Sequence, residues 1–114
     1  MQDVNDWLER EAFPLGVTLS FFQSNHEGEI IDKLQEQRHW ANGCVINPAG
    51  LTHYSIALRD AISGCQVPTV EVHISDIHAR EEFRQHSVVK DVCVMQISGK
   101  GKDGYLEAIK KLST

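Results

Sequence analysis

The sequence predicts an α/β fold in which helices cover both faces of a parallel β-sheet. Short apolar runs rich in β-branched residues alternate along the chain with stretches whose apolar residues recur at helical spacing, a pattern typical of parallel sheets. The first three apolar runs also lead into polar clusters. Because the carboxyl ends of parallel strands gather at one edge of a sheet, we expect a ligand site at that edge.

The elements are expected in the order helix, then strand and helix repeated four times. An amphipathic helix is expected at residues 1–13, where Pro14 and Gly16 end it. Strands are expected at residues 17–22, 44–46, 69–74 and 92–97. Further helices are expected from residue 30 to about residue 40, after Thr52 as N-cap, within the polar segment 75–87, and at residues 105–112.

Composition and net charge limit the kinds of binding partner that we expect for this protein. The 114 residues are expected to form one domain, residues 1–114, with 41% hydrophobic and 24% charged residues. A net charge of -5 gives no long-range field that would gather nucleic acid or an anionic membrane. The amino terminus is polar, and no apolar run approaches the roughly 18 residues that span a bilayer. We therefore expect a cytoplasmic protein that binds neither nucleic acid nor membrane.

The cysteine and histidine patterns favour no metal site. Cys44, Cys65 and Cys93 are far apart in the sequence, whereas zinc sites usually contain close cysteine pairs. We expect three reduced, buried thiols. The histidine spacings match no ligand pattern either, so we expect no metal site.

His73 is the residue most suited to chemistry. It lies where the apolar run from Thr69 gives way to a segment dense in His, Asp, Glu and Arg. Glu71, two residues earlier on the expected strand, projects to the same face, where a carboxylate can orient or charge an imidazole. From the residues alone, a purely structural buried histidine remains open. From the residues alone, a solvated helix face is the favoured interpretation of Arg80 and Arg84.

Three long motifs resemble type II 3-dehydroquinate dehydratases and together span most of the chain. They are FQSNHEGEIID at 22–32, INPAGLTHYSIALRD at 46–60 and VEVHISDIHAREEFRQHS at 70–87. The resemblance implies a flavodoxin-like, three-layer α/β/α fold and trimers that assemble into a dodecamer, without metal or cofactor. It also implies the dehydration of 3-dehydroquinate to 3-dehydroshikimate, either in the shikimate pathway of aromatic amino acid biosynthesis or in quinate catabolism.

The resemblance assigns roles position by position. His73 matches the general acid that protonates the departing hydroxyl, and Glu71 matches the carboxylate that orients it. An imidazole suits this task near neutral pH. The other matched positions contact the substrate or the lid: Asn47, His53 and Arg84 for the substrate's hydroxyls, Ile74 and Ser75 for its carboxylate, Asp60 from a neighbouring subunit, and Arg80 for holding the lid.

The sequence also departs from the family. Members begin with an apolar strand, an Asn-Gly-Pro-Asn type of turn and a lid whose Tyr is the proton-abstracting base and whose Arg activates it. None of these precedes residue 1 here, and Tyr54 and Tyr105 do not lie where the lid would be. The missing strand would lie centrally, between residues 17–22 and 44–46, and its loss would leave two unpaired edges.

Two hypotheses follow from this departure. In the first, the true start lies upstream and the full product is an active lyase. In the second, the short chain is a non-catalytic relative that binds dehydroquinate-like acids or assembles with full-length subunits. Under either hypothesis we expect at most trace turnover from the 114 residues, because positioned base catalysis contributes roughly 10²- to 10⁴-fold.

Overall fold

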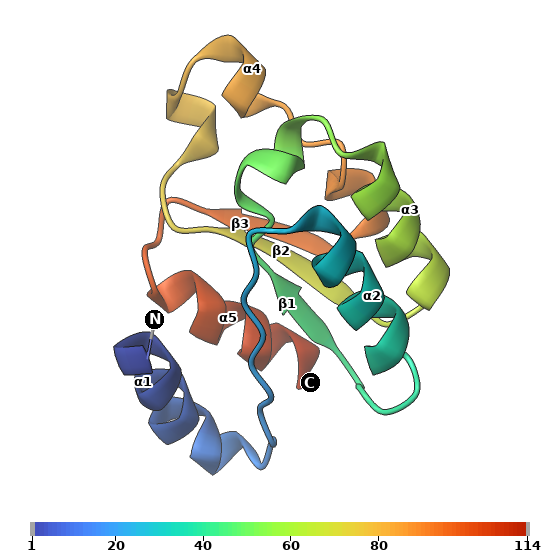
Figure 1. Ribbon diagram of the computed structural model, residues 1–114. Helices are drawn as coiled ribbons and strands as arrows, with labels where there is room; N and C mark the ends of the chain where they lie inside the picture. The colour runs from blue at the N-terminus through green and yellow to red at the C-terminus, as the bar shows by residue number, and fades with distance from the viewer. Residues whose placement is uncertain (1, 114) are drawn as a thin grey trace.

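A parallel sheet of three strands forms the centre of the computed structural model, which describes residues 2–113 (Figure 1). The predicted α/β class is therefore confirmed. The expected helix start at Met1 lies outside the described residues.

The strands are β1 (Cys44–Ile46), β2 (Thr69–His73) and β3 (Met95–Ser98). The α-helices are α1 (Gln2–Ala12), α2 (Glu27–Gln37), α3 (Ile56–Cys65), α4 (Glu82–Gln85) and α5 (Asp103–Leu112). Short 3₁₀ turns are η1 (Phe13–Leu15), η2 (Ala49–His53), η3 (Ile77–Ala79) and η4 (Lys90–Val92).

The strands lie in the order β1-β2-β3, so β2 is central. Glu71 of β2 lies opposite Ile46 of β1 and opposite Gln96 of β3. His73, two residues further on, lies opposite Ser98. Since partners in register project to the same face of a sheet, Glu71, His73 and Gln96 share one face.

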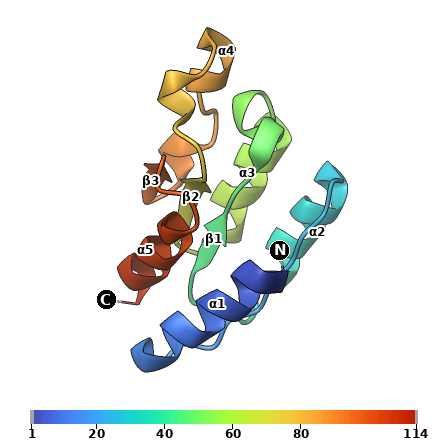
Figure 2. The same ribbon diagram turned by 90° about the vertical axis from the view of Figure 1, so that its left-hand side faces the viewer.

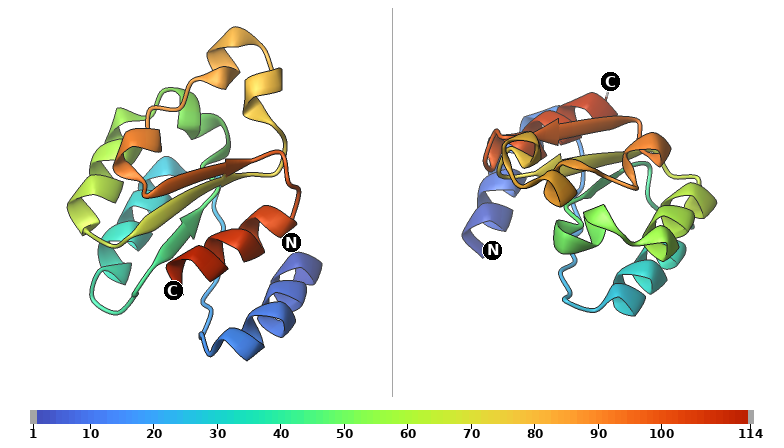
Figure 3. Two further views of the ribbon diagram at one scale, coloured as in Figure 1. Left: turned by 180° about the vertical axis from the view of Figure 1, so that it is seen from behind. Right: turned by 90° about the horizontal axis from the view of Figure 1, so that it is seen from above.

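Helices cover both faces, which gives three layers (Figures 2 and 3). On one face, Val70, Val72 and Ile97 pack against Ala108 of α5, and α1 lies outside α5. On the other face, a cluster joins α2 and α3 to the segment that follows α4; its buried members are Leu34, Leu58, Ala61, Ile62 and Val89. None of the described helices has the length and apolar character needed to cross a membrane.

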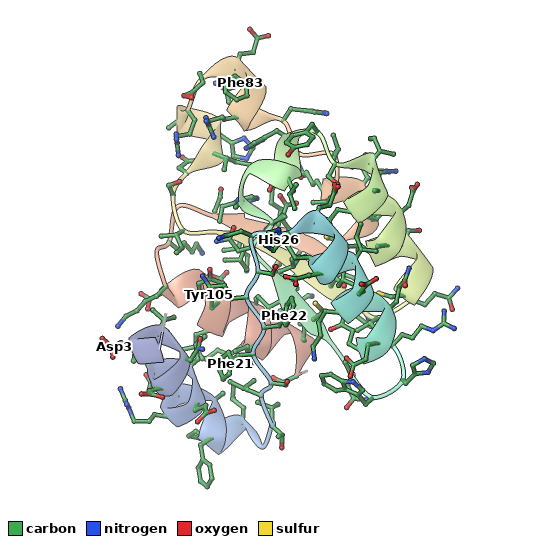
Figure 4. The ribbon with its side chains drawn as sticks, viewed as in Figure 1. Asp3, Phe21, Phe22, His26, Phe83 and Tyr105 are labelled. Carbon is green, nitrogen blue, oxygen red and sulfur yellow. The ribbon has the colours of Figure 1, made fainter. Side chains whose placement is uncertain are left out.

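The predicted strand at residues 17–22 is wrong. The segment is extended but pairs with no other strand among residues 2–113, and the outer edge of β1 is likewise unpaired. Val17 and Leu19 instead pack against α1 and α5, whereas Phe21 and Phe22 are exposed (Figure 4). A strand needs a neighbour for its backbone groups, and nothing in the described chain lies between this segment and β1 as a strand.

Two local predictions also need correction. Thr52 is not the N-cap of α3: Ser55 is, with its Oγ accepting a hydrogen bond from the Leu58 amide at 3.0 Å. Thr52 instead lies inside η2 and is fully buried. The last strand begins at Met95 rather than residue 92, because residues 90–92 form η4.

Candidate active site

A cavity of about 250 Å³ opens where β1 and β2 end. Its outer wall is the arm, which we define as residues 75–86; this segment holds η3 and α4 and projects from the body of the molecule in Figure 1. Seven of the nine residues expected at the site line the cavity: Asn47, His53, His73, Ile74, Ser75, Arg80 and Arg84. Ala49, Gly50 and Ile77 complete the lining. The structure thus brings together the polar segments that follow β1 and β2.

Glu71 lies behind His73 rather than in the cavity wall. The His73 Nε2 and Glu71 Oε2 atoms are 2.5 Å apart, and the two residues are 5% and 0% exposed. Burial raises the pKa of Glu71, but hydrogen bonds from His73, Gln96 and Ser87 outweigh it, so the net pKa is lowered. The carboxylate is therefore ionised and can only accept, which makes Nε2–H the donor. Nδ1 of His73 is the ring nitrogen left for a ligand.

Asn47 is held from both ends of its side-chain amide. Its Oδ1 accepts a hydrogen bond from the Ala49 amide at 3.1 Å, and its Nδ2 donates to the Tyr105 hydroxyl oxygen at 3.0 Å. Ala49 has a φ of +52°, a left-handed conformation that is strained for a residue with a Cβ. Tyr105 comes from α5, which is not part of the arm (Figure 4). Sequence reasoning missed this contact, because the two residues are far apart in the chain.

His53 is oriented by the far end of the arm. Its Nδ1 lies 2.8 Å from the His86 carbonyl oxygen, which can only accept, so Nδ1–H is the donor. Nε2 of His53 is then available to a ligand in the cavity. The ring also meets the edge of Phe83 in α4, with the centroids 6.3 Å apart.

The cavity carries positive charge from the arm. Arg80 Nη1 lies 3.4 Å from the Ser75 Oγ, and Arg84 Nε donates to Glu81 Oε1 at 2.6 Å. Glu81 does not line the cavity, and no acidic residue is found among the described residues that do. With no carboxylate among the lining residues, the guanidinium groups of Arg80 and of Arg84, the latter already paired with Glu81, favour an anionic ligand.

Asp60 does not join this cavity. It lies on α3 and, with residues of α2, lines a separate hollow. The expected role for Asp60 toward a neighbouring subunit stays a prediction. Within residues 2–113, no group of three or more His, Cys, Asp or Glu side chains is arranged to hold a metal ion. All three cysteines are free thiols; Cys65 is buried, while Cys44 and Cys93 are half-buried.

Known proteins resemble this chain in sequence over nearly its whole length. The sequence profile described as "Dehydroquinase class II" matches residues 1–113. The chain belongs to the class II dehydroquinase family. It is 50% identical to the 3-dehydroquinate dehydratase of Halothermothrix orenii over 112 residues, which cover 98% of this chain and 76% of that protein. It is 55% identical to the enzyme of the same name from Bacillus pumilus, again covering 98% of this chain and 76% of the relative.

The fold comparison agrees with this assignment. The crystal structure of type II dehydroquinase from Butyrivibrio crossotus superimposes with a TM-score of 0.96 at 42% identity, covering 99% of this chain and 79% of that one. The resemblance inferred from the three sequence motifs and the flavodoxin-like fold that it implied are both confirmed. The chain spans about three quarters of the length of these dehydroquinase relatives.

Proposed function

We propose that this dehydroquinase chain acts on 3-dehydroquinate and eliminates water to give 3-dehydroshikimate. The observation that carries the proposal is the His73–Glu71 pair, which places an imidazole backed by an ionised carboxylate at the wall of a cavity with two arginines. Family membership supports the same reaction class, a hydro-lyase.

His73 is proposed as the general acid. The substrate carbonyl acidifies the neighbouring C–H bond, a base removes that proton, and hydroxide leaves poorly unless an acid donates to it. Nδ1 of a protonated His73 is free to make this donation, so that the group departs as water. The negative charge of Glu71 stabilises the imidazolium and fixes the plane of its ring. Asn47 and His53, with Arg84, are proposed to bind the substrate's hydroxyls.

The substrate's carboxylate is proposed to bind at the start of the arm. Ile74 and Ser75 follow β2 directly and line the cavity, and we propose that their backbone N–H groups and the Ser75 hydroxyl bind the carboxylate. The charge of Arg80, next to Ser75, favours an anion there. Arg80 is also proposed to hold a lid over the bound substrate.

The base half of the reaction is proposed to come from a lid segment like that of the family, which is not among these 114 residues. We therefore expect the chain to bind the substrate while turning it over only in trace amounts. We further propose a cytoplasmic role in the shikimate pathway or in quinate catabolism. Assembly into trimers and then a dodecamer would bring Asp60, exposed on α3, to a neighbour's cavity.

Calorimetric titration of the 114-residue chain with 3-dehydroquinate tests the binding role. We expect saturable binding that Arg84→Ala weakens at least tenfold, while Arg10→Ala on α1 serves as a matched loss of charge outside the cavity. Absence of binding, or equal effects of the two substitutions, would contradict the proposal.

Turnover is followed separately, by the ultraviolet absorbance of the conjugated enone product. A rate within tenfold of that of full-length relatives would show that the base is present in this chain after all. In a protein that also carries the lid, His73→Ala should abolish turnover, and retained activity would remove His73 from the mechanism.

A further inference from the structure

We propose that Ser87 and Gln96 are positioning residues that hold the Glu71 carboxylate ionised and in place, so that His73 keeps its proton on Nε2 and presents Nδ1 to the cavity. This inference rests on the proposed function, because it concerns the pair to which that function assigns the acid step. Neither residue lines the cavity, so each acts through Glu71.

The Ser87 hydroxyl is a hydrogen-bond donor to the Glu71 carboxylate. Its Oγ lies 3.0 Å from Oε1 and 2.9 Å from Oε2 of the carboxylate. The same Oγ accepts hydrogen bonds from the backbone amides of Val89 at 3.3 Å and Lys90 at 3.1 Å. With the hydroxyl's lone pairs turned to these amides, its single proton is directed at Glu71. The backbone around Ser87 is itself fixed, since the Val88 amide donates to the Thr52 carbonyl oxygen at 2.8 Å.

Gln96 supplies a third donor from the neighbouring strand. It lies opposite Glu71 in the β2–β3 register, and its Nε2 donates to Glu71 Oε2 at 3.1 Å. Oε2 therefore receives hydrogen bonds from His73, Ser87 and Gln96, while Oε1 receives one from Ser87. A carboxylate with no exposed surface has no water to replace a lost donor.

The surroundings of Glu71 offer few other groups that could replace a lost hydrogen bond to its carboxylate. On the side of the sheet opposite Gln96, Glu71 is paired with the apolar Ile46 of β1, and the α3 residues in the cluster on this face, such as Leu58 and Ile62, are also apolar. Cys93 is a further titratable group that interacts with Glu71. Burial, together with the charges of Glu71 and Cys44, raises the pKa of Cys93 to about 12, so this thiol stays neutral over the working range.

Removing one donor therefore shifts the balance toward the protonated carboxyl. Burial disfavours the ionised form, and the hydrogen bonds are what overcome it. A protonated Glu71 would donate to Nε2 of His73 instead of accepting from it. The ring would then be a neutral imidazole with its proton on Nδ1, and it would be a much weaker acid toward the cavity than an imidazolium.

Nuclear magnetic resonance of the 114-residue chain tests this without relying on turnover. The carboxyl ¹³C shift of Glu71 gives the pH at which it titrates, and the ring ¹⁵N shifts of His73 give its tautomer. The variants are Ser87→Ala and Gln96→Leu, each of which removes one donor. Ser113→Ala is the control, because its Oγ donates to the Lys110 carbonyl oxygen at the end of α5, away from Glu71. Ser87→Thr retains a hydroxyl and should restore wild-type behaviour.

We expect the Glu71 midpoint to move to higher pH in Ser87→Ala and in Gln96→Leu, and the Nδ1–H tautomer of His73 to appear at correspondingly higher pH. Unchanged midpoints in both variants would overturn the proposal. Should Ser87→Ala not fold, Gln96→Leu decides alone, because residue 96 is half-buried on an edge strand. Failure of the proposed function would appear separately, as normal titration shifts in a chain that does not bind 3-dehydroquinate.

Discussion

The side-chain amide of Asn47 and the hydroxyl of Tyr105 are joined by a hydrogen bond of 3.0 Å. This contact ties the loop after β1 to α5 and so fixes a cavity residue from outside the cavity. We expect Tyr105→Phe to lower the free energy of unfolding by at most about 1 kcal/mol, because it removes one acceptor and water can solvate the exposed Nδ2 in its place. Chemical denaturation measures this. Tyr54→Phe, at an exposed tyrosine, is the control and should change nothing; equal losses in both variants would refute the role.

The stability of the chain should depend on pH through Glu71. Its pKa is lowered on folding from an ordinary value of 4.5, so its stabilising contribution is complete above that pH and is lost as the pH falls through the folded value. Glu71→Gln should therefore be destabilising at neutral pH, by an amount that shrinks on acidification. Urea denaturation at several pH values measures the difference, with Glu9→Gln as control. A difference independent of pH would contradict the assignment.

The thiols should react slowly in the native chain. Burial raises the pKa of Cys44, and that of Cys93 is raised to about 12, while only the thiolate is a nucleophile. We expect alkylation by iodoacetamide at pH 8 to be at least tenfold slower in the native chain than in urea. Mass spectrometry of the labelled peptides assigns the rates. Fast native labelling of Cys93 would show that the thiol is more accessible than in this structure.

The unpaired segment at residues 17–22 should promote self-association. Phe21, on this unpaired segment, is 38% exposed, whereas Phe83, 60% exposed, lies at the tip of the arm (Figure 4). We expect Phe21→Lys to reduce concentration-dependent light scattering and Phe83→Lys to change it little. A larger effect of Phe83→Lys would place the contact on the arm instead.

Much of this structure could be predicted from local patterns. The amphipathic spacing around Trp7 and Leu8 predicted α1, and the β-branched run ending at His73 predicted β2. The strand at 17–22 failed because pairing is not a local property: the same residues are extended whether or not a neighbour is present. The cap of α3 failed because Thr52 and Ser55 are both capable, and η2 decides between them by burying Thr52.

The candidate site likewise contains features that local sequence predicts and features that depend on the tertiary structure. The His73–Glu71 pair follows from a spacing of two along one strand, so the sequence alone suggested it. The contribution of Gln96 depends on the register between β2 and β3, which no local pattern specifies. Tyr105 reaches Asn47 across 58 positions of sequence, a relationship visible only in three dimensions.

The arm begins and ends at the same carboxylate, since His73 on one side and Ser87 on the other both donate to Glu71. The residues that flank the arm are thus both hydrogen-bonded to one buried carboxylate, whatever the number of residues between them. Shortening or lengthening the arm at its tip, near Phe83 of α4, should therefore leave the His73–Glu71 pair undisturbed. Such changes would alter which molecules can enter the cavity, and the arm is the natural place to retune selectivity by grafting.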